Sequence, residues 1–228
     1  MKKHEVRGWI EETGIIAAVR MDAPDDALFA AESVAAGGIP VVEITFTVPH
    51  ATKVITHLAK NRPQVVVGAG GVTDAGVAQQ CFEAGAKFLT SDGLHPAVIE
   101  FASRHDLVVF PGALTPTEVL TAWELSVDFV KVVPCAQIGG ERYVLSLNKM
   151  FPRIPLIASG GVTQQNASKF ILAGAVALGV GRELVPKDAI RLRQPDRIAE
   201  LARRFLGFVK SGRDHLAARQ TRGMAMDE

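Results

Sequence analysis

Residues 128–135 read DFVKVVPC, an apolar run with a single lysine, Lys131, at its centre. The Val and Phe content and the closing Pro134 are typical of a buried central strand of a parallel sheet, where a charge is unfavourable. Burial favours the neutral amine, a nucleophile that attacks carbonyls and forms a Schiff base. In the alternative interpretation, Lys131 lies at a strand end and extends to solvent. The continuation of the run to Pro134 strengthens the interpretation of a lysine inside the strand, and the sequence of this run alone leaves both interpretations open.

Strand and helix patterns alternate on both sides of this run. A helix pattern over residues 2–13 comes first, and eight units of one strand followed by one helix come after it. Eight uninterrupted units favour a closed barrel over an open doubly wound sheet. We therefore predict an α/β fold, a (β/α)8 TIM barrel with an extra N-terminal helix. The predicted strands are 15–19, 41–46, 65–69, 87–91, 107–110, 129–133, 155–159 and 175–179.

The predicted units follow one another without a linker. With 228 residues, of which 48% are hydrophobic, the chain can bury one large core. We predict a single barrel domain over residues 1–211. Residues 212–228 place Arg213, Arg219 and Arg222 among small residues, and we expect them to form a frayed C-terminal tail.

Composition argues against several kinds of partner and cofactor. The 25 basic and 24 acidic residues give a net charge of +1, so no overall field favours nucleic acid or a membrane. The N-terminus lacks an apolar signal segment, and no apolar run is long enough to span a bilayer. Cys81 and Cys135 are too few for a disulfide framework, and neither they nor the six histidines have metal-ligand spacing. We expect a cytoplasmic protein with a small-molecule substrate and no metal or other cofactor.

The active site of such a barrel lies at the C-terminal ends of its strands. One acidic residue there, Glu43, lies inside an apolar strand on the same face as Val41 and Thr45. If this face lines the barrel, Glu43 and Lys131 meet, either as a structural ion pair or with the carboxyl acting in proton transfer. The other candidates, expected to bind substrate, are Arg20, Thr45, Thr47, Gly70, Gly71, Asp92, Pro134, Ser159, Gly160, Gly161, Gly181 and Arg182.

Glycine-rich turns follow three of the predicted strands. The turns at 159–163 and 179–182 come after strands seven and eight, where many barrels bind a phosphate through backbone amides. In the alternative interpretation these glycines only permit tight turns. The turn at 68–71 lacks the third spaced glycine of a dinucleotide fingerprint, and we expect it to make room for the substrate.

Five stretches of the chain together resemble a known family. They read VEITFTVP at 42–49, GAG at 68–70, PGALTPTE at 111–118, VKVVP at 130–134 and SGGV at 159–162. On these motifs the sequence resembles the 2-keto-3-deoxy-6-phosphogluconate (KDPG) and 4-hydroxy-2-oxoglutarate (KHG) aldolases. The resemblance extends over nearly the whole chain, roughly residues 5–210.

The resemblance implies a class I aldolase on a (β/α)8 barrel, a homotrimer without a cofactor. It implies that Lys131 forms a Schiff base with the C2 carbonyl of a 2-keto-4-hydroxy acid, and that Glu43 is the general acid and base. The products would be pyruvate and an aldehyde, either glyceraldehyde 3-phosphate or glyoxylate. The sequence does not choose between a phosphorylated six-carbon sugar acid, its C4 epimer and 4-hydroxy-2-oxoglutarate.

The sequence departs from the family where substrate is bound. Some members bind the substrate carboxylate with an arginine at the position of Thr47. A branch with the same EITFTVP strand has an arginine at the end of the first strand instead, so we assign the carboxylate to Arg20. Where several members have a serine in the last phosphate turn, this chain has Arg182, which can hold a phosphate or a distal carboxylate.

Three further departures alter the predicted pocket. The threonine of the family's GAGT is Gly71, the proline of its SPG is Asp92, and the usual aromatic beside the strand proline is Val133. They keep two other functions open. A phosphate-binding isomerase or epimerase would use the lysine without a covalent intermediate, and a non-catalytic protein would only bind a sugar acid.

Overall fold

The computed structural model describes residues 1–224, in which helices and strands alternate. The strands are β1 (Ile15–Val19), β2 (Val41–Thr45), β3 (Val66–Gly70), β4 (Phe88–Thr90), β5 (Val108–Phe110), β6 (Gly112–Ala113), β7 (Val130–Val132), β8 (Leu156–Ser159) and β9 (Ala175–Val180). The helices are α1 (Lys3–Thr13), α2 (Pro24–Ala36), α3 (Ala51–Asn61), α4 (Ala75–Glu83), α5 (Pro96–Arg104), α6 (Pro116–Glu124), α7 (Gly140–Met150), α8 (Ala167–Leu172), α9 (Lys187–Arg191) and α10 (Pro195–Met224). A 3-10 turn, Ala136–Ile138, precedes α7.

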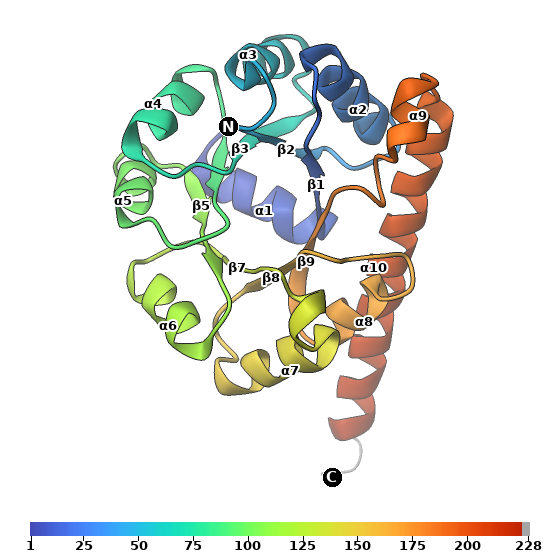
Figure 1. Ribbon diagram of the computed structural model, residues 1–228. Coiled ribbons are helices and arrows are strands. Elements are labelled where there is room, and N and C mark those ends of the chain that lie inside the picture. Colours follow the sequence, from blue (N-terminus) through green and yellow to red (C-terminus); the bar gives the residue numbers. More distant parts are fainter. Residues whose placement is uncertain (225–228) are drawn as a thin grey trace.

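All the strand pairs are parallel, in the order β5-β4-β3-β2-β1-β9-β8-β7-β6. The two edge strands, β5 and β6, are separated along the chain by Pro111 alone, so the sheet closes into a barrel ringed by helices (Figure 1). Residues 1–224 contain nine strands rather than the eight predicted, because the short strand β6 follows the predicted fifth strand after Pro111, which has no amide hydrogen and separates the two. The predicted TIM barrel with an extra N-terminal helix is therefore confirmed.

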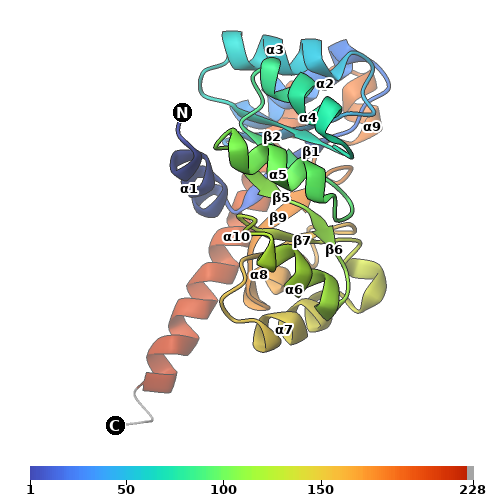
Figure 2. The same cartoon turned by 90° about the vertical axis from the view of Figure 1, so that its left-hand side faces the viewer.

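Helix α1 closes one end of the barrel. Its Val6 and Ile10 pack against residues near the strand starts, among them Ile16, Val41 and Phe129. Figure 1 shows α1 on the far side of the barrel, and Figure 2 shows it at one end. Because α1 covers the N-terminal ends of the strands, the opposite end, where the strands finish, is the open one.

Polar contacts attach α1 to the barrel floor. The buried carboxylate of Asp128 forms an ion pair of 3.0 Å with Lys3 Nζ and accepts a hydrogen bond of 2.8 Å from the backbone amide of Val109. The guanidinium of Arg7 lies 5.4 Å from the ring centroid of Phe129. The first residue of the DFVKVVPC run is therefore structural.

The final helix, α10, continues to Met224 and projects past the barrel (Figure 2). The sequence predicted a frayed tail over 212–228, whereas residues 212–224 are helical; 225–228 lie outside the described residues. Arg213 explains part of the difference, since its guanidinium donates to the last carbonyls of α1, including a 2.6 Å bond to Glu12 O. Within residues 1–224, no helix is both long enough and apolar enough to cross a membrane.

Candidate active site

Lys131 lies in the middle of β7 and points into the barrel. Its neighbours Val130 and Val132 pack in the core between sheet and helices, so Lys131 lies on the opposite, inner face, like Phe129. Only 5% of its side chain is exposed. Lys131 therefore lies inside the strand. Its amine is at the open end of the barrel, and Phe129, two residues earlier on the same face, packs at the closed end.

Asp92 provides the carboxylate that contacts Lys131. It follows β4, and its Oδ1 lies 2.8 Å from Lys131 Nζ, while its Oδ2 lies 3.8 Å from a guanidinium nitrogen of Arg20. Desolvation raises the pKa of Asp92, but the charge and hydrogen bond of Lys131 and the charge of Arg20 outweigh it, so the pKa lies below its ordinary value. The side chain is 60% exposed, so solvent screens these attractions. Asp92 therefore remains ionised at neutral pH.

The backbone of Asp92 is held by a close approach to β6. A Cβ atom at Gly112 would lie 2.3 Å from the carbonyl carbon of Asp92, so only glycine fits there. Ser91 Oγ also donates a 2.7 Å hydrogen bond to Gly93 O, which fixes the turn. The loop thus fixes the backbone of Asp92 at a position from which its carboxylate reaches Lys131.

Glu43 is the second carboxyl group at the site. Val42 and Ile44 pack in the outer core, so Glu43 points into the barrel as the strand alternation predicted. Burial raises the pKa of Glu43; the charges of Lys131 and Arg20 lower it by less, and Asp92 raises it further. The group is therefore shifted toward the neutral carboxylic acid.

The expected contact between Glu43 and Lys131 is not formed. Among the ion pairs within residues 1–224, Lys131 is joined to Asp92 and not to Glu43. The carboxyl of Glu43 lies over Gly70 on β3, where a Cβ atom would come within 2.0 Å of Glu43 Oε1. The two charges still act on each other, because Lys131 lowers the pKa of Glu43.

The glycines of the turn at 68–71 make room for the protein's own side chains rather than for substrate alone. A Cβ atom at Gly68 would lie 2.3 Å from the ring of Phe88, and the space over Gly70 is occupied by Glu43. Gly71 has a φ of +71°, a left-handed conformation that favours glycine. The expected room for substrate is therefore limited to the level of Gly71.

The two threonines that were predicted to bind substrate, Thr45 and Thr47, form hydrogen bonds within the protein. Thr45 Oγ1 donates a 3.0 Å hydrogen bond to Val19 O and accepts one of 3.2 Å from Thr47 Oγ1. These bonds tie the end of β2 to the end of β1, beside Arg20. Arg20 itself is exposed at the barrel mouth, where its guanidinium can reach an anion.

Thr90 was not singled out from the sequence. It is the last residue of β4, fully buried, and its hydroxyl has no hydrogen-bond partner among the described residues. The alternation Phe88, Thr90, Asp92 along this strand places it on the inner face, because Phe88 belongs to the barrel floor. That alternation was the available signal. An unpaired buried hydroxyl can donate to, or accept from, a bound molecule.

The glycine turn after β8 packs against the end of β7. Gly160 and Gly161 have φ angles of +82° and +86°. A Cβ atom would lie 2.8 Å from Pro134 Cα in the first case and 2.4 Å from Ala136 Cβ in the second. The Val133–Pro134 peptide bond at the end of β7 is cis. Tight packing therefore explains the glycines at 160 and 161, which is the alternative that the sequence left open. The same packing is compatible with an anion bound by the backbone amides of this turn.

The remaining predicted residues lie at the ends of the neighbouring strands. Ser159 pairs with Gly179 across β8 and β9, and a Cβ atom at Gly179 would lie 2.7 Å from Ser159 Oγ. Gly181 and Arg182 follow β9 directly, and Arg182 is exposed. The strand order places these residues between Lys131 on β7 and Arg20 after β1. Among the described residues 1–224, no hydrogen bond or ion pair joins Arg182 to Lys131, Asp92 or Arg20.

The arrangement combines a buried amine with two carboxyl groups in different environments. Groups whose surroundings push their pKa values apart are suited to separate acid, base and charge-holding roles. Within residues 1–224 there is no group of three or more His, Cys, Asp or Glu side chains that could hold a metal ion. The chemistry that these residues themselves offer is amine attack on a carbonyl, assisted by proton transfer.

Two surface hollows lie away from this cluster. One of about 600 Å³ lies over α3 and α4, and one of about 560 Å³ lies between α1 and α10. None of the predicted site residues lines either hollow. The barrel mouth is the better candidate for the active site, because the buried amine and the two carboxyl groups with shifted pKa values meet there.

Comparison with known proteins gives a consistent result. The sequence profile of a family described as KDPG and KHG aldolase matches residues 6–201. The 2-dehydro-3-deoxy-phosphogluconate aldolase of Treponema pallidum (strain Nichols) is 27% identical over 200 residues, which cover 88% of this chain and 95% of that protein. The KHG/KDPG aldolase of Escherichia coli (strain K12) is 30% identical over 173 residues, covering 76% and 81%.

A solved structure is similar in fold and sequence. It is the KDPG aldolase of Legionella pneumophila with pyruvate captured at low pH as a covalent carbinolamine intermediate. Its TM-score is 0.80 at 26% identity, covering 87% of this chain and 96% of that one. Together with the profile match over most of the chain, these similarities establish that the chain belongs to the KDPG and KHG aldolase family.

Proposed function

We propose that this protein is a class I aldolase that cleaves a 2-keto-4-hydroxy acid to pyruvate and an aldehyde, with Lys131 as the Schiff-base lysine. The observation that carries the proposal is the setting of Lys131 Nζ, which is buried on an apolar strand at the open end of the barrel. Membership of the KDPG and KHG aldolase family supports the same reaction.

The reaction follows from the chemistry of an amine and a ketone. The Lys131 ammonium first gives up a proton, and the resulting neutral amine adds to the C2 carbonyl. The carbonyl oxygen takes up a proton, and the carbinolamine, protonated on its hydroxyl, loses water to give an iminium cation. The iminium accepts the electron pair of the C3–C4 bond as that bond breaks, while the C4 hydroxyl gives up its proton and the aldehyde leaves. The resulting enamine is protonated at C3, and water then hydrolyses the iminium to release pyruvate and the amine.

Glu43 is proposed as the group that carries these protons. Its pKa is raised by burial, which brings a carboxyl group closer to the pH at which it can both give and accept a proton. It can give a proton to the leaving water and accept one from the C4 hydroxyl. The shared inner face of β2 and β7 supports this role, since both side chains project toward the same space.

The substrate is proposed to lie across the barrel mouth with its carboxylate toward Arg20. Its distal end would lie toward Gly160, Gly161 and Arg182, with the buried hydroxyl of Thr90 free to bond a substrate oxygen. Candidate substrates are 2-keto-3-deoxy-6-phosphogluconate, which yields glyceraldehyde 3-phosphate, and 4-hydroxy-2-oxoglutarate, which yields glyoxylate. The exposed guanidinium of Arg182 accommodates either a phosphate or a carboxylate.

The decisive experiment is borohydride reduction of the purified protein in the presence of pyruvate, followed by peptide mass mapping. We expect a stable adduct on Lys131. The variant Lys131→Ala should remain folded, give no adduct and lose turnover. If a known class I aldolase is labelled in parallel and this protein is not, the Schiff-base mechanism is wrong, and an isomerase or a binding protein becomes the better explanation.

We further propose a cytoplasmic homotrimer. Large exposed apolar side chains on the neighbouring helices α6 and α7, such as Leu120, Leu145 and Met150, give a surface for self-association. Two buried, unpaired cysteines suit a reducing compartment. Multi-angle light scattering tests the trimer directly, and the mass of a monomer or dimer would contradict it.

A further inference from the structure

Lys131 has a fixed ionic partner that the proposed mechanism does not yet use. We propose that Asp92 is a further catalytic residue, the resident counter-ion that holds the positive charge on Lys131 Nζ, first as the ammonium and later as the iminium. This inference rests on the proposed function, because it assigns a role at the Schiff-base nitrogen. The observation behind it is the 2.8 Å hydrogen bond from Lys131 Nζ to Asp92 Oδ1.

The position of this carboxylate is set by the fold. The backbone of Asp92 packs on Gly112, where any side chain would collide with the Asp92 carbonyl group. The ion pair also crosses the barrel mouth, since Asp92 follows β4 and Lys131 lies on β7. Moving the carboxylate away by a shift of the loop would open that packing, so we expect it to remain beside Nζ throughout the reaction.

The two carboxyl groups divide the chemistry between them. When the new bond from Nζ to C2 forms and the oxygen of C2 leaves as water, the nitrogen regains a positive charge and keeps one hydrogen. The ionised Asp92 carboxylate, 2.8 Å from that nitrogen in the free protein, accepts a hydrogen bond from it and offsets the charge. Glu43, which lies over Gly70 and away from Nζ, is left to carry protons.

Four charged or titratable groups face one another here: Glu43 from β2, Asp92 after β4, Lys131 from β7 and Arg20 after β1. Removing the charge of Asp92 therefore has a second effect. Asp92 is one of the groups that raise the pKa of Glu43, so its neutralisation should lower that pKa. A purely structural role for Asp92 would not move this titration.

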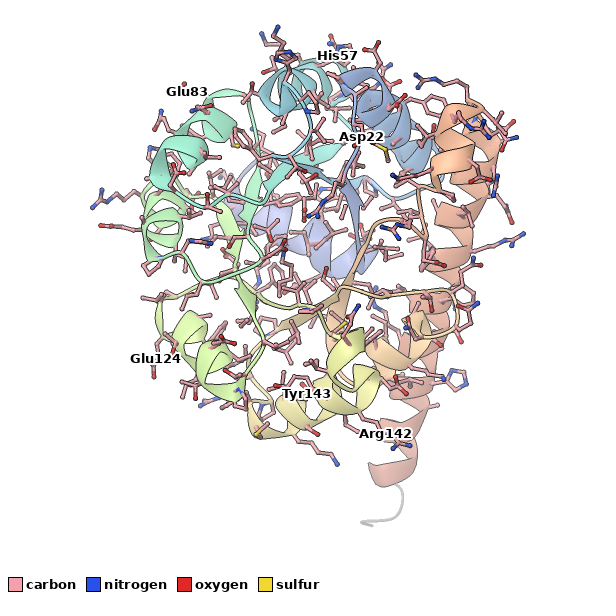
Figure 3. All side chains as sticks on the ribbon, viewed as in Figure 1. Asp22, His57, Glu83, Glu124, Arg142 and Tyr143 are labelled. Atoms are coloured by element: carbon pink, nitrogen blue, oxygen red, sulfur yellow. The ribbon has the colours of Figure 1, made fainter. Side chains whose placement is uncertain are left out.

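The test compares Asp92→Asn, which removes the charge with little change of shape, with Asp22→Asn, a matched variant on the loop after β1 (Figure 3). In Asp92→Asn, we expect the pyruvate adduct still to map to Lys131, while kcat falls about tenfold, the scale of one charge-assisted hydrogen bond. The limb of the pH–rate profile that belongs to Glu43 should move to lower pH. Asp22→Asn should match the wild type in both measurements, and Asp92→Glu, which keeps the charge, should recover part of kcat.

Other results overturn the inference. If Asp92→Asn has the kcat and pH profile of Asp22→Asn, Asp92 is not the counter-ion. If kcat falls with the pH limb unmoved and with a lower melting temperature, Asp92 is only structural. Failure of the proposed function looks different, because then the wild-type protein itself gives no adduct with pyruvate.

Discussion

The substitution Gly70→Ala tests whether the position of the Glu43 carboxyl controls catalysis. A Cβ atom at position 70 would lie 2.0 Å from Glu43 Oε1, 2.4 Å from Cδ and 2.7 Å from Cγ. Real Cβ atoms essentially never approach a heavy atom closer than 3.0 Å, so the carboxyl has to move by about 1 Å. The φ angle of Gly70 lies outside the left-handed region, so alanine itself is not strained there.

The expected loss of activity follows from this displacement. A misplacement of about 1 Å in a catalytic group costs on the order of 10²-fold in rate, and we expect kcat to fall by that factor. Overpacking of a buried site should lower the free energy of unfolding by about 1–3 kcal/mol. Lys131 and Asp92 are untouched, so borohydride should still trap pyruvate on Lys131, although more slowly.

The assay is steady-state release of pyruvate, with circular dichroism and urea unfolding to check the fold. The matched control is Gly93→Ala, whose Cβ atom meets nothing closer than 3.7 Å, and it should keep wild-type activity. The double variant Gly70→Ala with Glu43→Asp should recover activity relative to Gly70→Ala, since the shorter side chain vacates the space. Wild-type kcat in a folded Gly70→Ala variant would refute the assignment of Glu43 as the proton carrier.

Three further predictions concern stability and reactivity. Because burial raises the pKa of Glu43, the folded chain binds its proton more tightly than the unfolded chain, and stability falls as pH rises above the ordinary value of 4.5. Glu43→Gln should therefore be more stable than wild type in urea at neutral pH, and the difference should vanish well below pH 4.5; an equal difference at both pH values would contradict this. Asp128→Ala leaves the buried amide of Val109 unpaired and removes the ion pair with Lys3 of α1, so urea unfolding should show a loss of about 2 kcal/mol; an unchanged midpoint would rule this out. Burial raises the pKa of Cys81 and of Cys135 to about 12, so iodoacetamide should label neither thiol in the native protein and both after unfolding, and native labelling at neutral pH would show that the burial is wrong.

Much of the fold could be read from local pattern. Most strands of the barrel are largely apolar, buried runs, and each except β5 is followed by a helix, so periodicity identified nearly all of them. The short strand β6 after Pro111 and the helical continuation of α10 past residue 211 were not predicted. The second depends on Arg213 reaching the end of α1, a contact between segments 201 residues apart.

The sequence by itself determined the barrel, the lysine inside one strand and the inward direction of Glu43, because each of these depends on the order of residues along the chain. Only the tertiary structure decided which carboxylate contacts Lys131. Asp92 lies 39 residues away along the chain, and the contact exists because strand register and the close packing at Gly112 bring its loop over the barrel mouth. Glu43 does not make that contact. Gly70 on the adjacent strand has no side chain, and the carboxyl of Glu43 lies in the space that a side chain there would fill. Such choices depend on which side chains share a volume after the barrel closes, and periodicity along one strand carries no information about that.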